Sequence, residues 1–263
     1  MLLEEKAALV TGGAGRLGRV IAAVLAREGA RVAVADVSAA RLEQARDQSK
    51  AAITIAADVT RADEVMRMVD TAESAVGPLD VLVTAHGYVT NRPLLEIGAE
   101  EWDQTFAVNV RGIMLCCQTI GRRWVERGAR GAIVNLSSGA SRSARPGSAH
   151  YSGSKAAVNM LTEVLATELG PHGIRVNAVL PGLVMDEVMR EEDPQQHPYV
   201  NLMLRLTPLG RTGAPLDIAE AVAFLASDRS AWTTGAMLEV TGGSHCGRTN
   251  APLTGNLRIH PNQ

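Results

Sequence analysis

A tyrosine and a lysine stand four residues apart in the segment Tyr151-Ser152-Gly153-Ser154-Lys155, which we predict to begin a helix. Residues at i and i+4 lie on one face of a helix, so the phenol and the ammonium can share a site. A free tyrosine has a pKa of ~10 and is a poor base at neutral pH. A cation within about 4–6 Å favours the phenolate, which can exchange a proton with an alcohol oxygen. Such pairs also occur on ordinary helix surfaces, so the interpretation depends on the rest of the chain.

A glycine-rich segment near the start of the chain supplies that context. Residues 11–18 read Thr-Gly-Gly-Ala-Gly-Arg-Leu-Gly, follow a short apolar run and open an amphipathic helical pattern. Gly13, Gly15 and Gly18 satisfy the G-x-G-x-x-G pattern, in which the missing side chains let the backbone approach a pyrophosphate at a helix N-terminus. The segment therefore predicts a dinucleotide-binding turn.

An acidic residue, Asp36, ends the second predicted strand. A carboxylate there accepts hydrogen bonds from ribose hydroxyls and repels a 2′-phosphate, which favours NAD over NADP. Arg16 is the competing signal, because a nearby guanidinium accommodates a 2′-phosphate. We give Asp36 the greater weight and expect NAD as cofactor.

Short apolar runs alternate with helical patterns along the chain. Runs without strict alternation are typical of strands buried on both faces, and their alternation with helices predicts an α/β fold. We expect a single-domain, Rossmann-type, doubly wound parallel sheet of about seven strands with helices on both faces. The predicted strands are residues 7–10, 32–36, 53–57, 81–84, 133–137, 176–180 and 237–240, with long helices at about 99–127 and 151–170.

The chain divides into one domain and a tail. We assign residues 1–243 to a dinucleotide-binding and catalytic domain and 244–263 to a C-terminal tail. Within the domain, a stretch at about 185–209 contains Pro194, Pro198 and Pro208 and breaks the rhythm of the elements. We interpret it as a long irregular excursion that serves as a substrate loop.

Composition excludes several classes of function. The formal charge of the 263 residues is −2 and aromatic residues make up 3%, which is unlike a nucleic-acid-binding surface. No apolar run approaches the roughly 20 residues of a membrane helix, and the first residues show no secretory signal pattern. Cys116, Cys117 and Cys246 have no disulfide or metal-ligand spacing. We expect a cytoplasmic protein without metal, nucleic-acid or membrane partners.

Taken in order, these motifs resemble the short-chain dehydrogenase/reductase family over nearly the whole chain. Thr11, Gly12 and Gly18 match three positions of its Thr-Gly-x-x-x-Gly-x-Gly turn. Ser138 lies 13 residues before Tyr151, the spacing of the family's catalytic serine. The separations of the motifs agree with the family as well as their residues do.

The resemblance implies roles for the matching residues. Tyr151 is the acid/base group, and Ser138 orients the substrate oxygen. Lys155 lowers the pKa of the tyrosine and contacts the nicotinamide ribose. Asn109 supports a water-mediated proton relay to the lysine. The residues expected at the cofactor are Gly12, Gly15, Arg16, Leu17, Gly18, Asp36, Asp58, Val59, Ala85, His86, Gly87, Tyr151, Lys155, Pro181, Gly182 and Val184.

Three places depart from the family pattern. Arg16 stands at the family's middle glycine, and Gly15 is a candidate to supply flexibility one residue earlier. Residues 84–87 read Thr-Ala-His-Gly instead of Asn-Asn-Ala-Gly, so His86 lies near the nicotinamide ribose or is a tolerated substitution. Asp186 replaces a threonine near the pyrophosphate, so its carboxylate points away or acts on substrate.

The leading hypothesis is an NAD(H)-dependent oxidoreductase that interconverts a secondary alcohol and a ketone. The alternatives are a non-catalytic, NAD-binding regulatory protein and, less favoured, lyase or epimerase chemistry on the same scaffold. The resemblance also implies a homotetramer or homodimer formed through the two long helices and the last strand. Substrate contacts are expected from Tyr88, Val89, Ala140, Ser141, Arg142, His150, Met185 and Met189. Arg142 and His150 are candidate anion or hydroxyl partners, and for Arg142 a surface position is the favoured interpretation.

Overall fold

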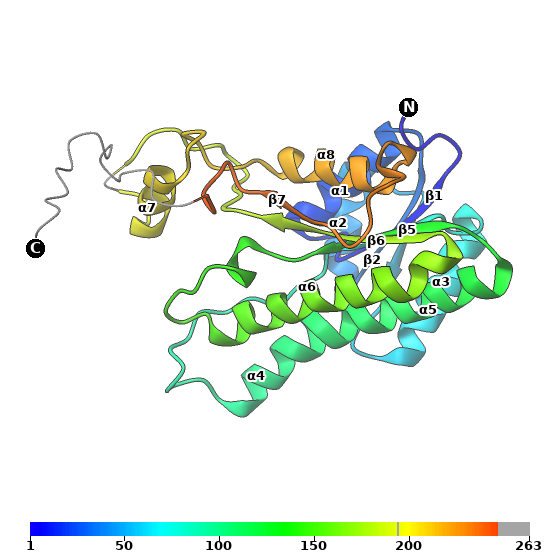
Figure 1. Ribbon diagram of the computed structural model, residues 1–263. Coiled ribbons are helices and arrows are strands. Elements are labelled where there is room, and N and C mark those ends of the chain that lie inside the picture. The colour runs from blue at the N-terminus through cyan, green and yellow to red at the C-terminus, as the bar shows by residue number, and fades with distance from the viewer. Residues whose placement is uncertain (194, 247–263) are drawn as a thin grey trace, which may run out of the picture.

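The computed structural model describes residues 1–193 and 195–246, and within them one parallel sheet of seven strands forms the centre of the molecule (Figure 1). The strand order is β3-β2-β1-β4-β5-β6-β7. Because β1 lies between β2 and β4, the order reverses there and opens a crevice at the carboxyl ends of the strands. The strands are β1 (Ala7–Thr11), β2 (Arg31–Asp36), β3 (Ile53–Ala56), β4 (Val81–Thr84), β5 (Gly131–Leu136), β6 (Ile174–Pro181) and β7 (Met237–Val240).

Helices cover both faces of this sheet, as Figure 1 shows. One face packs against α1 (Arg16–Arg27), α2 (Ala39–Ser49) and α8 (Pro215–Ala226). The other packs against α3 (Ala62–Val76), α5 (Ile113–Arg127) and α6 (Ala149–Leu169). A further helix, α4 (Ala99–Phe106), runs into α5 through a π-helical turn, η1 (Ala107–Gly112).

Both sides of the central strands are buried, which explains their apolar runs. On β1, Ala8 and Val10 join the core under α1 and α8, while Ala7 and Leu9 join the core under α3 and α5. The predicted fold class is confirmed, and two predicted strands, 81–84 and 237–240, match β4 and β7 residue for residue.

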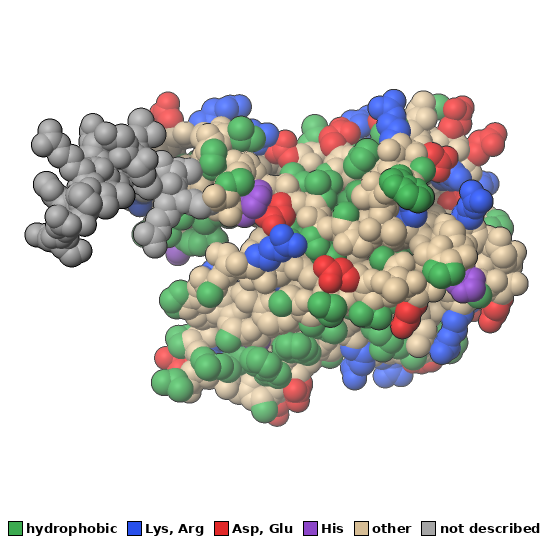
Figure 2. Space-filling model, in the orientation of Figure 1, with side chains coloured by type: hydrophobic (Ala, Val, Ile, Leu, Met, Phe, Trp, Pro, Cys, Tyr) green, Lys and Arg blue, Asp and Glu red, His purple; other side chains and the backbone are tan. Residues whose placement is uncertain are grey.

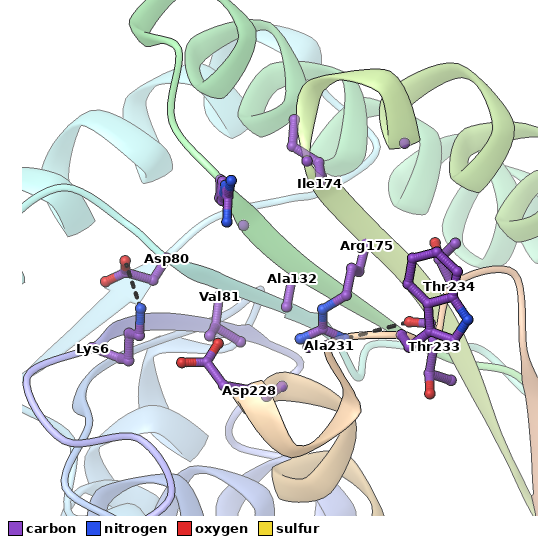
Figure 3. Close-up of a pocket in the computed structure, with 16 residues that line it drawn as sticks. Lys6, Asp80, Val81, Ala132, Ile174, Arg175, Asp228, Ala231, Thr233 and Thr234 are labelled. Atoms are coloured by element: carbon purple, nitrogen blue, oxygen red, sulfur yellow. Dashed lines mark hydrogen bonds and ion pairs between the residues drawn. The ribbon is translucent and has the colours of Figure 1, made fainter.

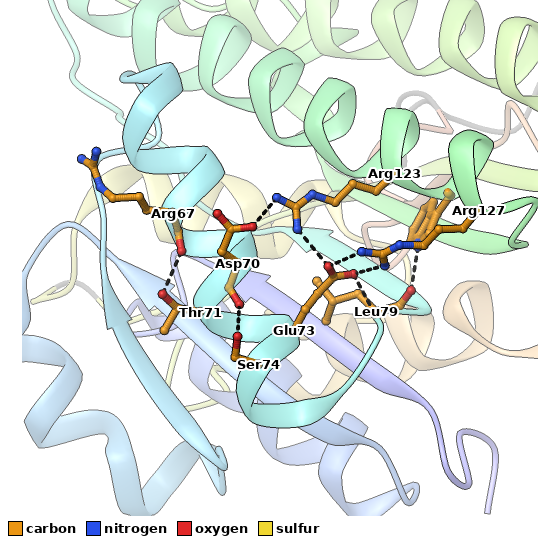
Figure 4. A network of polar contacts seen from close by, with 9 residues as sticks. Arg67, Asp70, Thr71, Glu73, Ser74, Leu79, Arg123 and Arg127 are labelled. Carbon is orange, nitrogen blue, oxygen red and sulfur yellow. Dashed lines mark hydrogen bonds and ion pairs between the residues drawn. The ribbon is translucent and has the colours of Figure 1, made fainter.

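A polar network fastens α3 to α5 (Figure 4). Glu73 accepts hydrogen bonds from Arg127 at 2.5 and 2.7 Å and from Arg123 at 2.9 Å. Arg123 also donates to Asp70 at 2.6 Å. These bonds hold the pKa of Glu73 at about 2, with Arg127 as the largest cause. The network joins α3 to α5, two of the helices that cover the same face of the sheet as α6.

The excursion after β6 is not wholly irregular. Residues 198–206 form a helix, α7 (Pro198–Leu206), which stands apart from the two helical layers in Figure 1. Our interpretation of 185–209 as irregular was therefore wrong for this part. Pro198 starts the helix, since proline at the first helical position loses no hydrogen bond and has a suitable φ. Val200 and Leu204, at i and i+4, are its buried residues.

The amino edge of the sheet holds a cavity of about 450 Å³ (Figure 3). Three of its charged groups make contacts within the fold: Arg175 donates to the backbone carbonyls of Leu225 and Ser227, and Lys6 lies 3.7 Å from Asp80. These contacts join the last part of the chain to the bases of the strands. The predicted site residues lie at the opposite edge.

No helix in the described part of the chain is both long enough and apolar enough to cross a membrane. The predicted boundary at residue 243 stays a prediction. Of the tail that we assigned to 244–263, only the first three residues are described, and the rest lies outside the described residues.

Candidate active site

The three predicted catalytic side chains meet where β5 ends and α6 begins. Ser138 follows β5, and its hydroxyl hydrogen-bonds the phenol of Tyr151 in the first turn of α6. One turn later, the ammonium of Lys155 lies 6.0 Å from the centroid of the Tyr151 ring. Lys155 is 3% exposed and donates to the carbonyl of Leu136 at 2.7 Å. Residues far apart in sequence thus converge at the carboxyl edge of the sheet.

Burial dominates the proton affinities of this cluster. It raises the pKa of Tyr151, an effect that the hydrogen bond from Ser138 partly offsets. It lowers the pKa of Lys155 to about 8. Burial outweighs the other causes and raises this pKa overall, so the lowering of the tyrosine pKa by Lys155 that the resemblance implies stays a prediction. At neutral pH Tyr151 is therefore a phenol, ready to donate a proton.

Asn109 lies in the π-helical turn and is fully buried. Its side chain accepts a hydrogen bond from the Tyr88 amide at 2.7 Å and donates to the Tyr88 carbonyl at 2.9 Å. It also donates to the Ser154 hydroxyl on α6 at 3.0 Å. The side chain clamps the segment after β4 to α6. A role of Asn109 in a proton relay, which the family resemblance implies, stays a prediction.

The glycine turn between β1 and α1 has no room for side chains at two positions. Gly12 has a φ of +66°, and a Cβ there would lie 2.5 Å from the backbone of His86. A Cβ on Gly18 would lie 2.1 Å from the Gly12 carbonyl oxygen. Arg16 begins α1 behind the N-cap Gly15, which offers no capping side chain. The first amides of α1 thus remain available to an anion.

A first cavity, of about 380 Å³, lies between the glycine turn and the ends of β2, β3 and β4. Asp36 forms part of its wall, and one carboxylate oxygen, Oδ1, accepts from the Ser38 amide at 3.1 Å and from Arg41 at 2.9 Å. The arginine beside Asp36 is therefore Arg41, which sequence reasoning missed, and not Arg16. The predicted cofactor residues that line this cavity are Gly12, Gly15, Asp36, Asp58, Val59, Ala85, His86 and Gly87.

A second cavity, of about 330 Å³, contains the reacting side chains. Ser138 and Tyr151 form one wall, and α7 contributes Tyr199 and Met203. The predicted cofactor residues found here are Arg16, Leu17, Pro181, Gly182 and Val184. Tyr151, also predicted at the cofactor, lines this second cavity, whereas Gly18 and Lys155 line neither cavity. The rest of the predicted cofactor set divides between the two spaces, and its residues fit the two ends of a dinucleotide.

His86 lies beneath the first cavity and is 8% exposed. Its Nδ1 shares a 2.6 Å hydrogen bond with the Thr11 hydroxyl. Burial, and to a smaller degree the charge of Lys155, lowers the pKa of His86 to about 3. The side chain is neutral at physiological pH and joins the end of β4 to the end of β1.

The two candidate polar substrate contacts are engaged within the protein, and the half-exposed side chain of Arg142 agrees with the favoured surface interpretation. Arg142 pairs with Glu239 at 2.6 Å, and His150 is buried against the Thr90 hydroxyl at 2.8 Å. Asp186 pairs with Arg19 on α1 at 3.4 Å, and this cation offsets the charge of a carboxylate that would otherwise repel a pyrophosphate. Sequence reasoning missed Tyr199, since the helical spacing in 198–206 was overlooked. It also missed Arg145, whose contact with Tyr199 joins two segments that are distant in sequence.

Comparisons with known proteins agree with this geometry. A family model described as Enoyl-(Acyl carrier protein) reductase matches residues 12–245. A (3R)-3-hydroxyacyl-CoA dehydrogenase of Canis lupus familiaris is 37% identical over 253 residues, covering 92% of this chain and 96% of the relative. A D-threitol dehydrogenase of Mycolicibacterium smegmatis is 37% identical over 245 residues, covering 92% and 93%.

A solved structure, a short-chain type dehydrogenase/reductase from Mycobacterium marinum, superposes with a TM-score of 0.85 at 33% identity. The match covers 93% of this chain and 97% of that one. The chain belongs to the short-chain dehydrogenase/reductase family. The resemblance drawn from the sequence is thereby confirmed, and the relatives named here are oxidoreductases of hydroxyl and keto groups.

Proposed function

We propose that this protein is an NAD(H)-dependent oxidoreductase that interconverts a secondary alcohol and a ketone, with Tyr151 as general acid and base. The observation that carries the proposal is the cluster of Ser138, Tyr151 and Lys155. Ser138 and Tyr151 line a cavity shared with predicted nicotinamide contacts, and Lys155 lies behind the Tyr151 ring. The named relatives act on an acyl-CoA and on a sugar alcohol, so their names support the reaction class without selecting a substrate.

Each side chain has a defined task in the reduction. Ser138 orients the substrate oxygen and the Tyr151 phenol, and the phenol gives its proton to that oxygen as the carbonyl becomes an alkoxide. The cofactor, when bound, supplies or accepts the hydride. In the oxidation the proton returns from the alcohol to the tyrosine. The buried ammonium of Lys155 stabilises the phenolate left behind by the reduction.

The choice of NAD is supported by Asp36, which is 7% exposed at the wall of the first cavity. Arg41 and Ser38 occupy its Oδ1, and among the described residues Oδ2 has no hydrogen-bond partner. That oxygen is available to a ribose hydroxyl. The ion pair with Asp36 also holds Arg41 away from the role of a phosphate ligand.

We further propose a cytoplasmic homotetramer or homodimer. Met160 and Val164 on α6 are 60% and 43% exposed, and hydrophobic side chains gather over the lower layer of the molecule in Figure 2. Burying such a surface against a second copy is favourable. Cys116 and Cys117 are buried free thiols, which suits a reducing compartment. Sedimentation velocity would detect the oligomer.

The proposal is tested by a screen of secondary alcohols and ketones with NAD(H) and NADP(H), read by absorbance of the reduced cofactor. We expect turnover on at least one chemical class with NADH preferred. Tight NADH binding without turnover across the panel would contradict the proposal and favour a non-catalytic, NAD-binding protein. Product formed without net change in absorbance would indicate lyase or epimerase chemistry.

A further inference from the structure

Arg145 lies in the wall of the same cavity as Tyr151, in the segment that joins β5 to α6. Its Nη1 donates to the hydroxyl of Tyr199 on α7 at 3.0 Å. Its Cζ also lies 5.4 Å from the centroid of the Tyr199 ring, a cation–π contact. Two segments that are distant in sequence thus hold one guanidinium group at the site.

The remaining donors of this group have no hydrogen-bond partner in the part of the chain that the structure describes. Arg145 Nε is buried without a hydrogen-bond partner. Among the described residues, Nη2 makes no hydrogen bond and no carboxylate pairs with Arg145. A buried donor without a partner costs about 1–3 kcal/mol. Together, Nε and Nη2 form the edge of a guanidinium that matches the two oxygens of a carboxylate.

The charge of the cavity wall also favours a negatively charged ligand. Its described lining includes Arg16 and Arg145 and contains no aspartate or glutamate. A nearby acid, Glu239, is already engaged by Arg142 at 2.6 Å and by His245 at 3.0 Å. A negatively charged ligand therefore meets positive charge here without a competing carboxylate.

We propose that Arg145 binds a carboxylate of the substrate, so that the preferred substrates are small hydroxy acids and keto acids. The inference rests on the proposed function, because it places the acid in the cavity where Tyr151 reacts. The carboxylate engages Nη2 and, after a small rotation of the guanidinium, Nε. Tyr199 is a positioning residue that holds the group in place. Because the cavity of about 330 Å³ also takes the nicotinamide end of the cofactor, only a short acid fits beside it.

Isothermal titration tests the assignment without turnover. The protein is saturated with NAD⁺, which cannot reduce a ketone, and titrated with 4-oxopentanoate, 3-oxobutanoate and the methyl ester of each. We expect the better acid to bind about tenfold more tightly than its ester. Arg145→Met should remove about tenfold of that affinity and leave ester binding within about threefold.

The matched control is Arg142→Met, which changes a neighbouring arginine that is paired with Glu239. It should leave the acid preference within about threefold of the unaltered protein. Equal binding of acids and esters by the unaltered protein, binding of neither, or an acid preference that survives Arg145→Met would overturn the assignment. The comparison within the unaltered protein stands even if a variant fails to fold.

Activity measurements distinguish the failure of the carboxylate site from the failure of the proposed oxidoreductase function. Arg145-dependent binding of acids without hydride transfer to any substrate would leave the carboxylate site standing and sink the proposed function. Turnover of neutral ketones with no preference for acids would support the proposed function and contradict the carboxylate site. Where both hold, Arg145→Met should raise KM for the acid more than it lowers kcat, because the group binds the substrate away from the reacting oxygen.

Discussion

Arg123 on α5 and Lys155 on α6 are cations in the same helical layer, and burial opposes the charge of both. For Arg123, hydrogen bonds to Asp70 and Glu73 outweigh burial and raise the pKa overall. For Lys155, burial lowers the pKa to about 8. Its ammonium donates to the carbonyl of Leu136 and not to a carboxylate.

The same contrast separates Glu73 from His86. Two arginines hold Glu73 in its charged form, whereas burial holds His86 in its neutral form. In the α3–α5 network, ion pairs therefore hold two helices together. At the candidate site, Lys155 and His86 are buried close to a cavity, without a carboxylate partner among the described residues. Perturbation of this second kind is typical of functional sites. Substitutions should consequently affect stability in the network and turnover at the site.

Among the substitutions that separate the two regions, the largest expected effect is at Lys155. Lys155→Met should reduce kcat by about 10²–10⁴-fold, because the phenolate loses its stabilising cation. The free energy of unfolding should change by less than about 1 kcal/mol, since relief of a buried charge offsets the lost bond to Leu136. Steady-state kinetics and urea unfolding measure the two quantities. A stable variant with normal turnover would contradict the distinction between a structural network at α3–α5 and a functional site at Lys155.

His86 predicts a dependence of stability on pH. Its pKa is about 3 in the folded protein against an ordinary value of 6.5, so the unfolded chain takes up a proton first as the pH falls. The free energy of unfolding should therefore decrease as the pH falls below 6.5, by about 3 kcal/mol between pH 7 and pH 4. Urea unfolding across this range measures the loss.

The matched variant for that experiment is His86→Asn, which keeps a polar group near the Thr11 hydroxyl but does not titrate. Its stability should fall less steeply between pH 6.5 and pH 4 than that of the unaltered protein. Parallel curves for the two proteins would show that His86 is not the group responsible.

A smaller effect is expected from Glu73→Gln. The change should lower the free energy of unfolding at pH 7 by about 2 kcal/mol, because Arg123 and Arg127 lose a charged partner. Since the pKa of Glu73 is depressed from 4.5 to about 2, its contribution is present above pH 4.5 and is lost as the pH falls toward 2. The kcat of the folded protein should be unchanged. A loss of kcat without loss of stability would reverse the assignment of the two regions.

The smallest effect concerns the cofactor. Asp36→Ala should shift the ratio of kcat/KM values toward NADPH by about tenfold, because it removes the carboxylate and releases Arg41. Adding Arg41→Ala should cancel the gain, whereas adding Arg16→Ala should not. A gain that persists without Arg41 and vanishes without Arg16 would assign the 2′-phosphate contact to Arg16, the competing signal in the sequence.

The sequence predicts the sheet well because buried parallel strands leave continuous apolar runs such as residues 81–84. It also predicts the neighbourhood of Tyr151, since i and i+4 spacing on a helix determines geometry directly. Pairings such as Asp36–Arg41 and Arg142–Glu239 depend on side-chain conformations that no local pattern specifies. The position of Arg145 depends on α7, whose start at Pro198 resembles the end of an element when only the sequence is considered.

The most direct test of the account is Tyr151→Phe. The substitution removes one hydroxyl and keeps the ring in the wall of the cavity. We expect kcat on the best substrate of the screen to fall by about 10³-fold or more, with the Kd for NADH within about threefold of the unaltered protein. Stopped-flow single-turnover kinetics and NADH fluorescence titration provide the two values. Hydride transfer at a normal rate in this variant would contradict the assignment of Tyr151 as the acid/base group.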